Sequence, residues 1–149
     1  MRYYSIVDYG ALVRAAAELH GHRLTPEAVD AVFPGQHRTV VLSAKNPPFA
    51  ALRAAFEGMG WTVAPFDPMP AEGGRVRAYP EVVMAIEVAT EILVHGADQI
   101  VLGTGAGAAY PIAAFARQHG RRVVARCYAQ QLSGELRRHC DRVDLLDLP

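Results

Sequence analysis

The segment from residue 99 to residue 112 constrains the fold more than any other part of the chain. It begins with an apolar run typical of a buried strand, passes through a glycine-rich turn at 103–107, and ends where a helix begins. This order is typical of α/β proteins, which often place a binding site at such a turn. Between Gly103 and Pro111, however, the chain contains no carboxylate, histidine, cysteine or lysine. The segment therefore has the architecture of a site and almost none of the reactive groups.

Strand-like and helical patterns alternate along the rest of the chain. Strands are predicted at 3–7, 39–42, 61–64, 100–102 and 122–125, with an edge strand at 143–146. Helices are predicted at 12–19, 25–33, 49–57, 80–95, 109–119 and 133–139. This alternation predicts a three-layer α/β/α sandwich with a mainly parallel sheet of five or six strands. No linker or repeat interrupts the sequence, so we expect a single domain over residues 1–149.

Two segments carry more specific expectations. The helix that begins at Pro80 has an apolar pattern at helical spacing, which predicts a core-facing side made of Val82, Val83, Ile86, Ala89, Ile92 and Leu93. The segment 65–77 contains three prolines and two glycines, and is predicted to be the longest and most mobile loop.

Charge and cysteine content narrow the functional classes. Fifteen basic and fifteen acidic residues cancel, so the overall charge gives no reason to expect a nucleic-acid-binding protein. The two cysteines do not form a CxxC pair and are expected to be reduced, with Cys127 buried as a small apolar residue. The first residues do not resemble a signal peptide and no apolar run is long enough to span a membrane, so we expect a cytoplasmic protein.

Several weak motifs follow one another in an order that is found in a known family. They lie at 79–87, 97–102, 120–124, 132–138 and 141–147. In order and spacing they resemble the NYN domains, PIN-like relatives of nucleases that include the LabA group. The resemblance covers nearly the whole chain and implies a PIN-like strand order. It also implies a metal-dependent ribonuclease, in which a first-strand aspartate, an acid at the start of the long helix and two aspartates of a Ser-Gly-Asp-x-Asp turn surround magnesium or manganese.

This chain matches that pattern only in part. Asp8 corresponds to the first aspartate, Glu81 to the helix acid, and Thr104 with Gly105 to the Ser-Gly pair. Ala106 and Ala108 stand where the resemblance implies aspartates. Ala11 likewise stands where the family usually has an asparagine. Alanine cannot ligate a cation, and each missing carboxylate weakens the attraction for the metal by on the order of a few kcal/mol.

The resemblance with these departures implies a degenerate, catalytically impaired ribonuclease-family domain. Asp8 and Glu81 would be vestigial catalytic residues and weak metal ligands at most. No cofactor is then expected, with magnesium or manganese required only for residual nuclease activity. A weakly active metal-dependent ribonuclease is the alternative, so the sequence leaves enzymatic activity open.

The expected partner is RNA or a protein, which could be a second copy of the chain. Candidate binding residues are Thr104, Gly105, Ala106, Gly107 and Ala108 in the turn, together with Arg122 and Arg126. These two arginines belong to a basic group with Arg121, Arg137, Arg138 and Arg142 that is suited to phosphate contacts. The same group could instead pair with Glu135, Asp141 and Asp144 on a solvated face.

Structural interpretations compete with the functional ones. Asp8 could cap the helix that follows it, and Glu81 is favoured near a helix N-terminus by the helix dipole alone. The turn 103–107 could hold the phosphate of a nucleotide or another small molecule on its backbone amides. Its glycines could equally serve close packing without any ligand.

Overall fold

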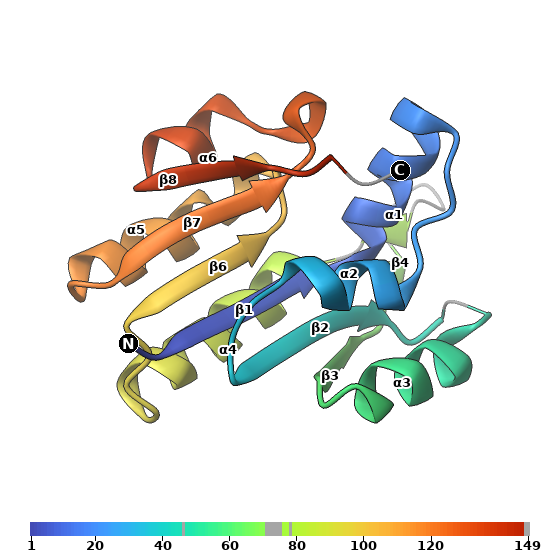
Figure 1. Cartoon of the computed structure of the whole chain (residues 1–149), viewed down its shortest axis with the longest axis horizontal. Coiled ribbons are helices and arrows are strands. Elements are labelled where there is room, and N and C mark those ends of the chain that lie inside the picture. Colours follow the sequence, from blue (N-terminus) through green and yellow to red (C-terminus); the bar gives the residue numbers. More distant parts are fainter. Residues whose placement is uncertain (46, 71–75, 78, 148–149) are drawn as a thin grey trace.

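The computed structural model describes residues 1–45, 47–70, 76, 77 and 79–147. Six parallel strands form one sheet in the order β3-β2-β1-β6-β7-β8 (Figure 1). Their bounds are β1 (Tyr3–Asp8), β2 (His37–Ser43), β3 (Thr62–Phe66), β6 (Gln99–Gly103), β7 (Arg122–Cys127) and β8 (Arg142–Leu145). The expected α/β/α sandwich with a parallel sheet is confirmed.

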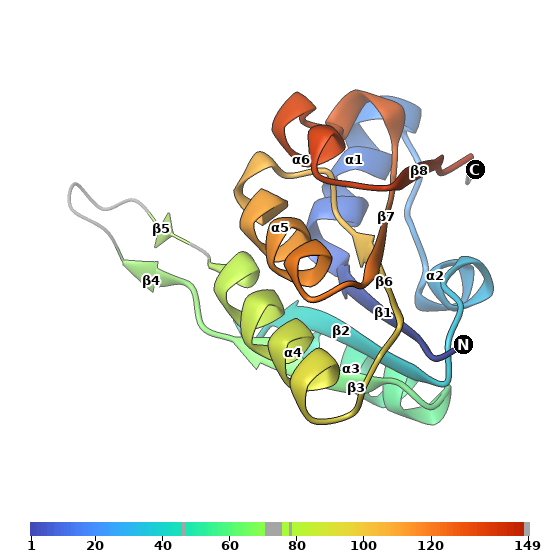
Figure 2. The ribbon, with the colours of Figure 1, turned by 90° about the vertical axis from the view of Figure 1, so that its left-hand side faces the viewer.

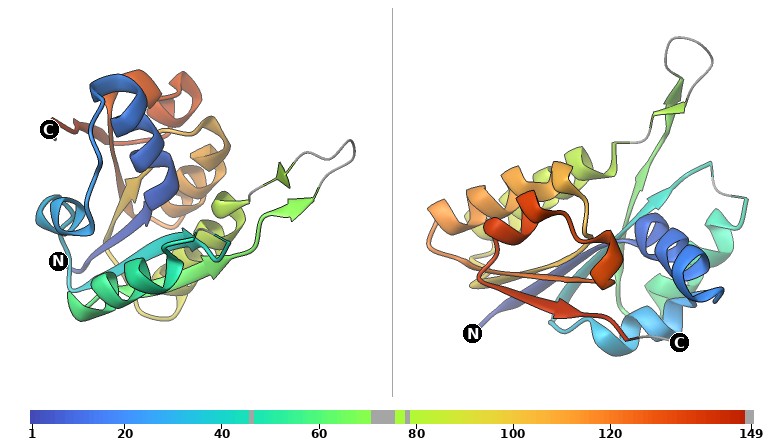
Figure 3. Two further views of the ribbon diagram at one scale, coloured as in Figure 1. Left: turned by 90° about the vertical axis from the view of Figure 1, so that its right-hand side faces the viewer. Right: turned by 90° about the horizontal axis from the view of Figure 1, so that it is seen from above.

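Helices cover both faces of this sheet, as an all-parallel sheet requires (Figures 1 and 3). One face is covered by α1 (Tyr9–His20), α2 (Pro26–Val32) and α3 (Phe49–Gly58), and the other by α4 (Pro80–Leu93), α5 (Tyr110–Gln118) and α6 (Gly134–Arg138). The short 3₁₀ helices η2 (Gly107–Ala109) and η3 (Ala129–Gln131) follow β6 and β7. Because the central strands are buried on both faces, they read as continuous apolar runs rather than alternating ones.

The order of the strands places a switch point between β1 and β6. The chain first builds the sheet outward from β1 through β2 to β3, then returns along α4 to β6 and builds outward in the opposite direction. Val7 pairs with Gly103 in the β1–β6 register, so Asp8 and Thr104 leave the sheet at the same level on neighbouring strands. Ligands of open parallel sheets bind outside the carboxyl ends of the strands at such a point.

The buried side of α4 differs from the sequence prediction. Met84, Val88 and Ile92 face the core, whereas Val82, Ile86 and Leu93 are 56%, 62% and 63% exposed. Apart from Ile92 and the partly buried Val83, the predicted core face is therefore wrong. The reason is that α4 carries two apolar stripes on opposite sides, and helical periodicity alone cannot decide which one packs on the sheet.

The segment 65–77 also contains regular structure that the sequence analysis did not predict. The end of β3 reaches Phe66, and β4 (Met69–Pro70) pairs antiparallel with β5 (Val76–Arg77). Figure 2 shows these two strands projecting away from the sandwich. The prolines and glycines that predicted a loop are compatible with a short hairpin, because a two-stranded edge needs few ladder hydrogen bonds. Residues 71–75 of the predicted mobile loop lie outside the described residues.

The expected burial of Cys127 is confirmed. Trp61 also packs in the core, with its indole nitrogen donating to Asp30 Oδ1 at 2.8 Å. Thr25 caps α2 by accepting a hydrogen bond from the amide of Ala28. In the part of the chain that the structure describes, no helix is long and apolar enough to cross a membrane.

Candidate functional site

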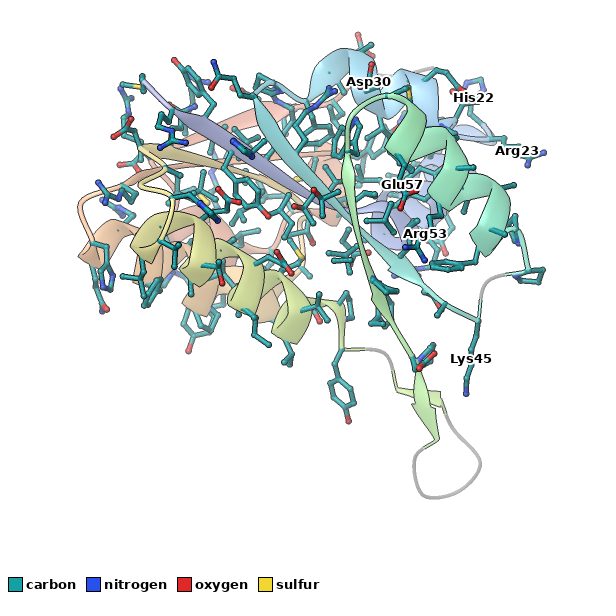
Figure 4. The ribbon with its side chains drawn as sticks, turned by 90° about the horizontal axis from the view of Figure 1, so that it is seen from below. His22, Arg23, Asp30, Lys45, Arg53 and Glu57 are labelled. Carbon is teal, nitrogen blue, oxygen red and sulfur yellow. The ribbon has the colours of Figure 1, made fainter. Side chains whose placement is uncertain are left out.

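A cleft of about 320 Å³ lies at the carboxyl ends of β1, β2 and β3. Its lining residues come from four segments of the fold: Asp8, Tyr9, Gly10 and Arg14 around the start of α1, Leu42, Ser43 and Lys45 at the end of β2, Phe66 and Pro68 at and just after the end of β3, and Pro80 at the start of α4. Each segment reaches this edge because parallel strands all end on the same side of a sheet. Figure 4 shows Lys45 beyond the end of β2, between α3 and the β4–β5 hairpin.

Asp8 is the buried carboxylate of this cleft. Only 4% of the residue is exposed, and its Oδ1 accepts a hydrogen bond of 3.2 Å from the amide of Ala11, which caps α1. Burial raises the pKa of Asp8 to about 6, against the lowering effects of the Ala11 hydrogen bond and of Arg14. Asp8 therefore caps the helix and also contributes a perturbed carboxylate to the cleft. A perturbed pKa in a cleft is typical of functional residues.

Glu81 is the second acid at this place. It lies half-buried in the first turn of α4, next to the cleft residue Pro80. The charge of Glu81 contributes to raising the pKa of Asp8. Of the two acids for which the sequence analysis found matches, Asp8 lines the cleft, whereas Glu81 lies beside it.

The remaining positions of the expected site lie in a closed turn. Thr104 is fully buried and its Oγ1 accepts a hydrogen bond from the amide of Ala106 at 3.2 Å. Ala106 is half-buried and Ala108 is exposed. Residues 104–108 are not among those that line the cleft beside Asp8.

The chain itself packs against the glycines of this turn. A β-carbon on Gly105 would lie 2.5 Å from the carbonyl oxygen of Gln131, and one on Gly107 would lie 2.9 Å from Ser133 Oγ. The carbonyl of Gly105 also accepts a 2.8 Å hydrogen bond from the amide of Ser133. A β-carbon on Gly103 would meet Val7 and Phe33 at 2.8 and 2.9 Å. Close approach of neighbouring chain segments therefore accounts for these glycines.

The arginines near the C-terminus are mostly engaged within the protein. Arg126 pairs with Asp144 at 2.7 Å, donates to the carbonyl of Val32 and lies over the ring of Phe33. Arg142 shares Asp144, Arg138 pairs with Glu135, and Arg117 approaches Asp141. The expected acidic partners are confirmed for Arg126, Arg138 and Arg142. Arg122 lies at the amino end of β7 beside Gln99, at the opposite edge of the sheet from Asp8.

Sequence reasoning missed the cations that do reach the cleft. Arg14 lies on the second turn of α1, and Lys45 comes two residues after β2 ends. Tyr9 and Gly10 also line a second hollow, of about 230 Å³, whose lining includes Arg23. The two hollows share Tyr9 and Gly10 in their linings and are together called the groove here; their linings include Arg14, Lys45 and Arg23. The sequence feature that could have identified Lys45 as a cleft residue is its position just after an inner strand of the parallel sheet.

The donor set around Asp8 is a poor one for a divalent metal ion. Hard cations such as Mg²⁺ require several oxygen ligands, and Asp8 and Glu81 supply the acids here beside the cation Arg14. Among the described residues, no group of three histidine, cysteine, aspartate or glutamate side chains is placed to hold a metal. Asp8 also uses one oxygen to cap α1.

Comparison with known proteins supports the fold alone. No family model matches the chain, and no curated protein matches it. The chain is similar to the crystal structure of a protein of unknown function from Vibrio parahaemolyticus, with a TM-score of 0.79 and 16% sequence identity. The similarity covers 98% of this chain and 93% of that one. The class that fold and site define is therefore an α/β/α protein with a mixed-charge groove at the carboxyl ends of its parallel strands.

Proposed function

We propose that this chain is a PIN-like domain of the NYN type with an impaired nuclease site, and that it binds RNA in the groove beside Asp8. The observation that carries the proposal is the lining of the groove, which contains Arg14, Lys45 and Arg23 and a single acid, Asp8. Cations spaced along a groove suit a phosphate backbone. Two carboxyl groups would hold only weakly the metal that phosphodiester cleavage in this family would need.

The protonation state of Asp8 adds a second expectation to this proposal. An ionised Asp8 repels a phosphate, and a neutral Asp8 does not. Because the pKa of Asp8 lies at about 6, RNA affinity should rise as the pH falls through that value. Asp8→Asn removes the charge, so this variant should bind RNA more tightly than wild type at neutral pH and lose this part of the pH dependence.

The binding half of the proposal is tested with a fluorescently labelled oligouridine and fluorescence anisotropy in EDTA. Arg14→Ala and Lys45→Ala should each weaken binding several-fold and reduce the salt dependence. Arg53→Ala is the matched control, because Arg53 is an exposed arginine that pairs with Glu57 on the outer side of α3 (Figure 4). Equal binding by all three variants, or no binding by wild type, would contradict the groove as an RNA site.

The family half of the proposal is tested by restoring the missing acids. With manganese and labelled RNA, wild type should not cut above the buffer background, whereas Ala106→Asp/Ala108→Asp should gain cleavage. If the double variant neither binds manganese nor cuts RNA, the NYN assignment loses its support. RNA binding by the groove is decided separately, by the anisotropy measurement.

A weakly active ribonuclease is a second candidate, favoured by the proximity of Glu81 to Asp8. It predicts slow manganese-dependent cleavage by wild type that Asp8→Asn abolishes. Cleavage that survives Asp8→Asn would point to a contaminating nuclease and count against this candidate.

A further inference from the structure

The outer side of α4 reverses the usual distribution of charge on a surface helix. Every exposed residue of this helix is uncharged: Val82, Ala85, Ile86, Thr90 and Leu93. Its three acids, Glu81, Glu87 and Glu91, are the half-buried ones. A surface helix normally turns its charged residues to water and its apolar residues to the core. An exposed apolar stripe on a surface helix marks an interaction site, which indicates that this side has a partner.

Four exposed apolar residues and the half-buried Ala89 form a regular seam. Tyr79, Val82, Ile86, Ala89 and Leu93 are spaced three, four, three and four residues apart. This is the spacing with which helices pair side by side, and it continues for two heptads. Ile86 lies at the centre of the seam.

A groove lies immediately beside the seam. Ala85 and Ala89 of α4, together with Pro111, Ile112 and Phe115 of α5, line a hollow of about 390 Å³ without a charged side chain. Figure 2 shows α4 and α5 side by side on this face of the molecule. The surface therefore carries an apolar ridge and an apolar groove next to each other.

We propose that this α4–α5 face binds a second copy of the same chain, with the two α4 helices antiparallel about a two-fold axis near Ile86. A two-fold interface joins the same surface patch on both copies, so the patch must complement itself. Here the ridge of one copy can enter the groove of the other, and the reverse contact follows by symmetry. The proposal is independent of RNA binding, because the groove beside Asp8 uses other residues.

The absence of charge favours a second copy over a charged partner. No exposed residue of α4 is charged, so the two-fold brings no like charges together across the axis. The chain has a formal net charge of zero, so two copies do not repel one another at long range. The exposed parts of Tyr79, Val82, Ile86, Leu93 and Val94 amount to on the order of 500 Å², compared with about 800 Å² per partner in a standard interface. The groove and its α5 rim supply further area.

The experiment is sedimentation equilibrium and light scattering on the full chain. Wild type should have about twice the 16.1 kDa mass of one chain at micromolar concentration. Ile86→Glu should be a monomer, with dimerisation weakened ~30-fold or more because a charge enters the centre of the interface. Leu19→Glu is the matched control, since Leu19 is an exposed apolar residue near the end of α1, and this variant should remain dimeric.

A mixing experiment tests the position of the axis. Ile86→Glu and Ile86→Lys should each be monomeric alone and should form a heterodimer when mixed, because the two charges meet at the axis. Failure to pair, with each variant folded by circular dichroism, would overturn the antiparallel arrangement about Ile86. A wild-type chain that is monomeric at several hundred micromolar, or a dimer that Ile86→Glu leaves intact, would overturn the interface itself.

Discussion

The carboxyl ends of the neighbouring strands β1 and β6 differ in almost every physical respect. β1 ends at Asp8, a buried carboxylate with a raised pKa that borders an open cleft. β6 ends in the glycine turn 103–107, which is apolar and packed against residues 131–133. The chain thus keeps a costly charged group beside open space at one strand end and fills the other strand end with its own backbone. A glycine-rich turn at a switch point therefore does not by itself mark the ligand site.

The largest expected effect comes from breaking the packed turn. Gly105→Ala would place a methyl group 2.5 Å from a backbone carbonyl that cannot move without shifting the chain at Gln131. We expect this substitution to lower the free energy of unfolding by about 2–4 kcal/mol, as measured by urea denaturation.

Gly58→Ala is the control for that substitution. Gly58 is the last residue of α3, and a β-carbon there meets nothing within 4 Å. This variant should be neutral or more stable by about 0.5 kcal/mol, because alanine restricts the unfolded chain more than glycine does. A Gly105→Ala protein as stable as wild type would mean that the turn is open after all, and would restore it as a candidate binding loop.

The second expected effect tests the cost of the charge at the end of β1. Asp8→Asn keeps a side-chain oxygen that can cap α1 and removes the buried charge. We expect this variant to be about 1–2 kcal/mol more stable than wild type at pH 7. Thermal or urea unfolding across the pH range measures this difference.

The pH dependence of that difference has a definite sign. The pKa of Asp8 is about 6 in the folded protein and 3.8 as its ordinary value, so the folded state holds the proton more tightly than the unfolded state. The gain from Asp8→Asn should be absent below about pH 4, grow as the pH rises through 6, and be complete above it. Asp8→Ala loses the cap as well and should fall below Asp8→Asn by about 1 kcal/mol at every pH. A constant difference between wild type and Asp8→Asn would mean that Asp8 is an ordinary cap.

Sequence patterns predicted more of the fold than of the candidate site. Apolar runs and their periodicity located the six strands of the sheet and the helices, because those signals are local. The buried side of α4 could not be predicted, since two apolar stripes compete and only the sheet selects Met84, Val88 and Ile92. Arg14, Lys45 and Arg23 converge on the groove from separate segments, so their proximity depends on the tertiary fold. Asp8 was accessible to sequence reasoning because a carboxylate directly after an inner strand is a local pattern.

Placing charge at the end of β6 should have the smallest effect on stability. It is also the most direct test of the comparison between the ends of β1 and β6. Ala106 is half-buried and Ala108 is exposed, so Ala106→Asp/Ala108→Asp should change the free energy of unfolding by less than about 0.5 kcal/mol. Asp8 and Thr104 leave the sheet at the same level, so new carboxylates two and four residues after Thr104 should lie close enough to repel an ionised Asp8. The pKa of Asp8, followed by carboxyl ¹³C NMR titration, should then rise above its wild-type value.

Ala129→Asp/Gln130→Asp adds the same charge at exposed positions of η3 and serves as the control for a general electrostatic effect. If both double variants move the pKa of Asp8 equally, the end of β6 does not share the cleft with Asp8, and the two strand ends are separate environments rather than two halves of one degenerate site.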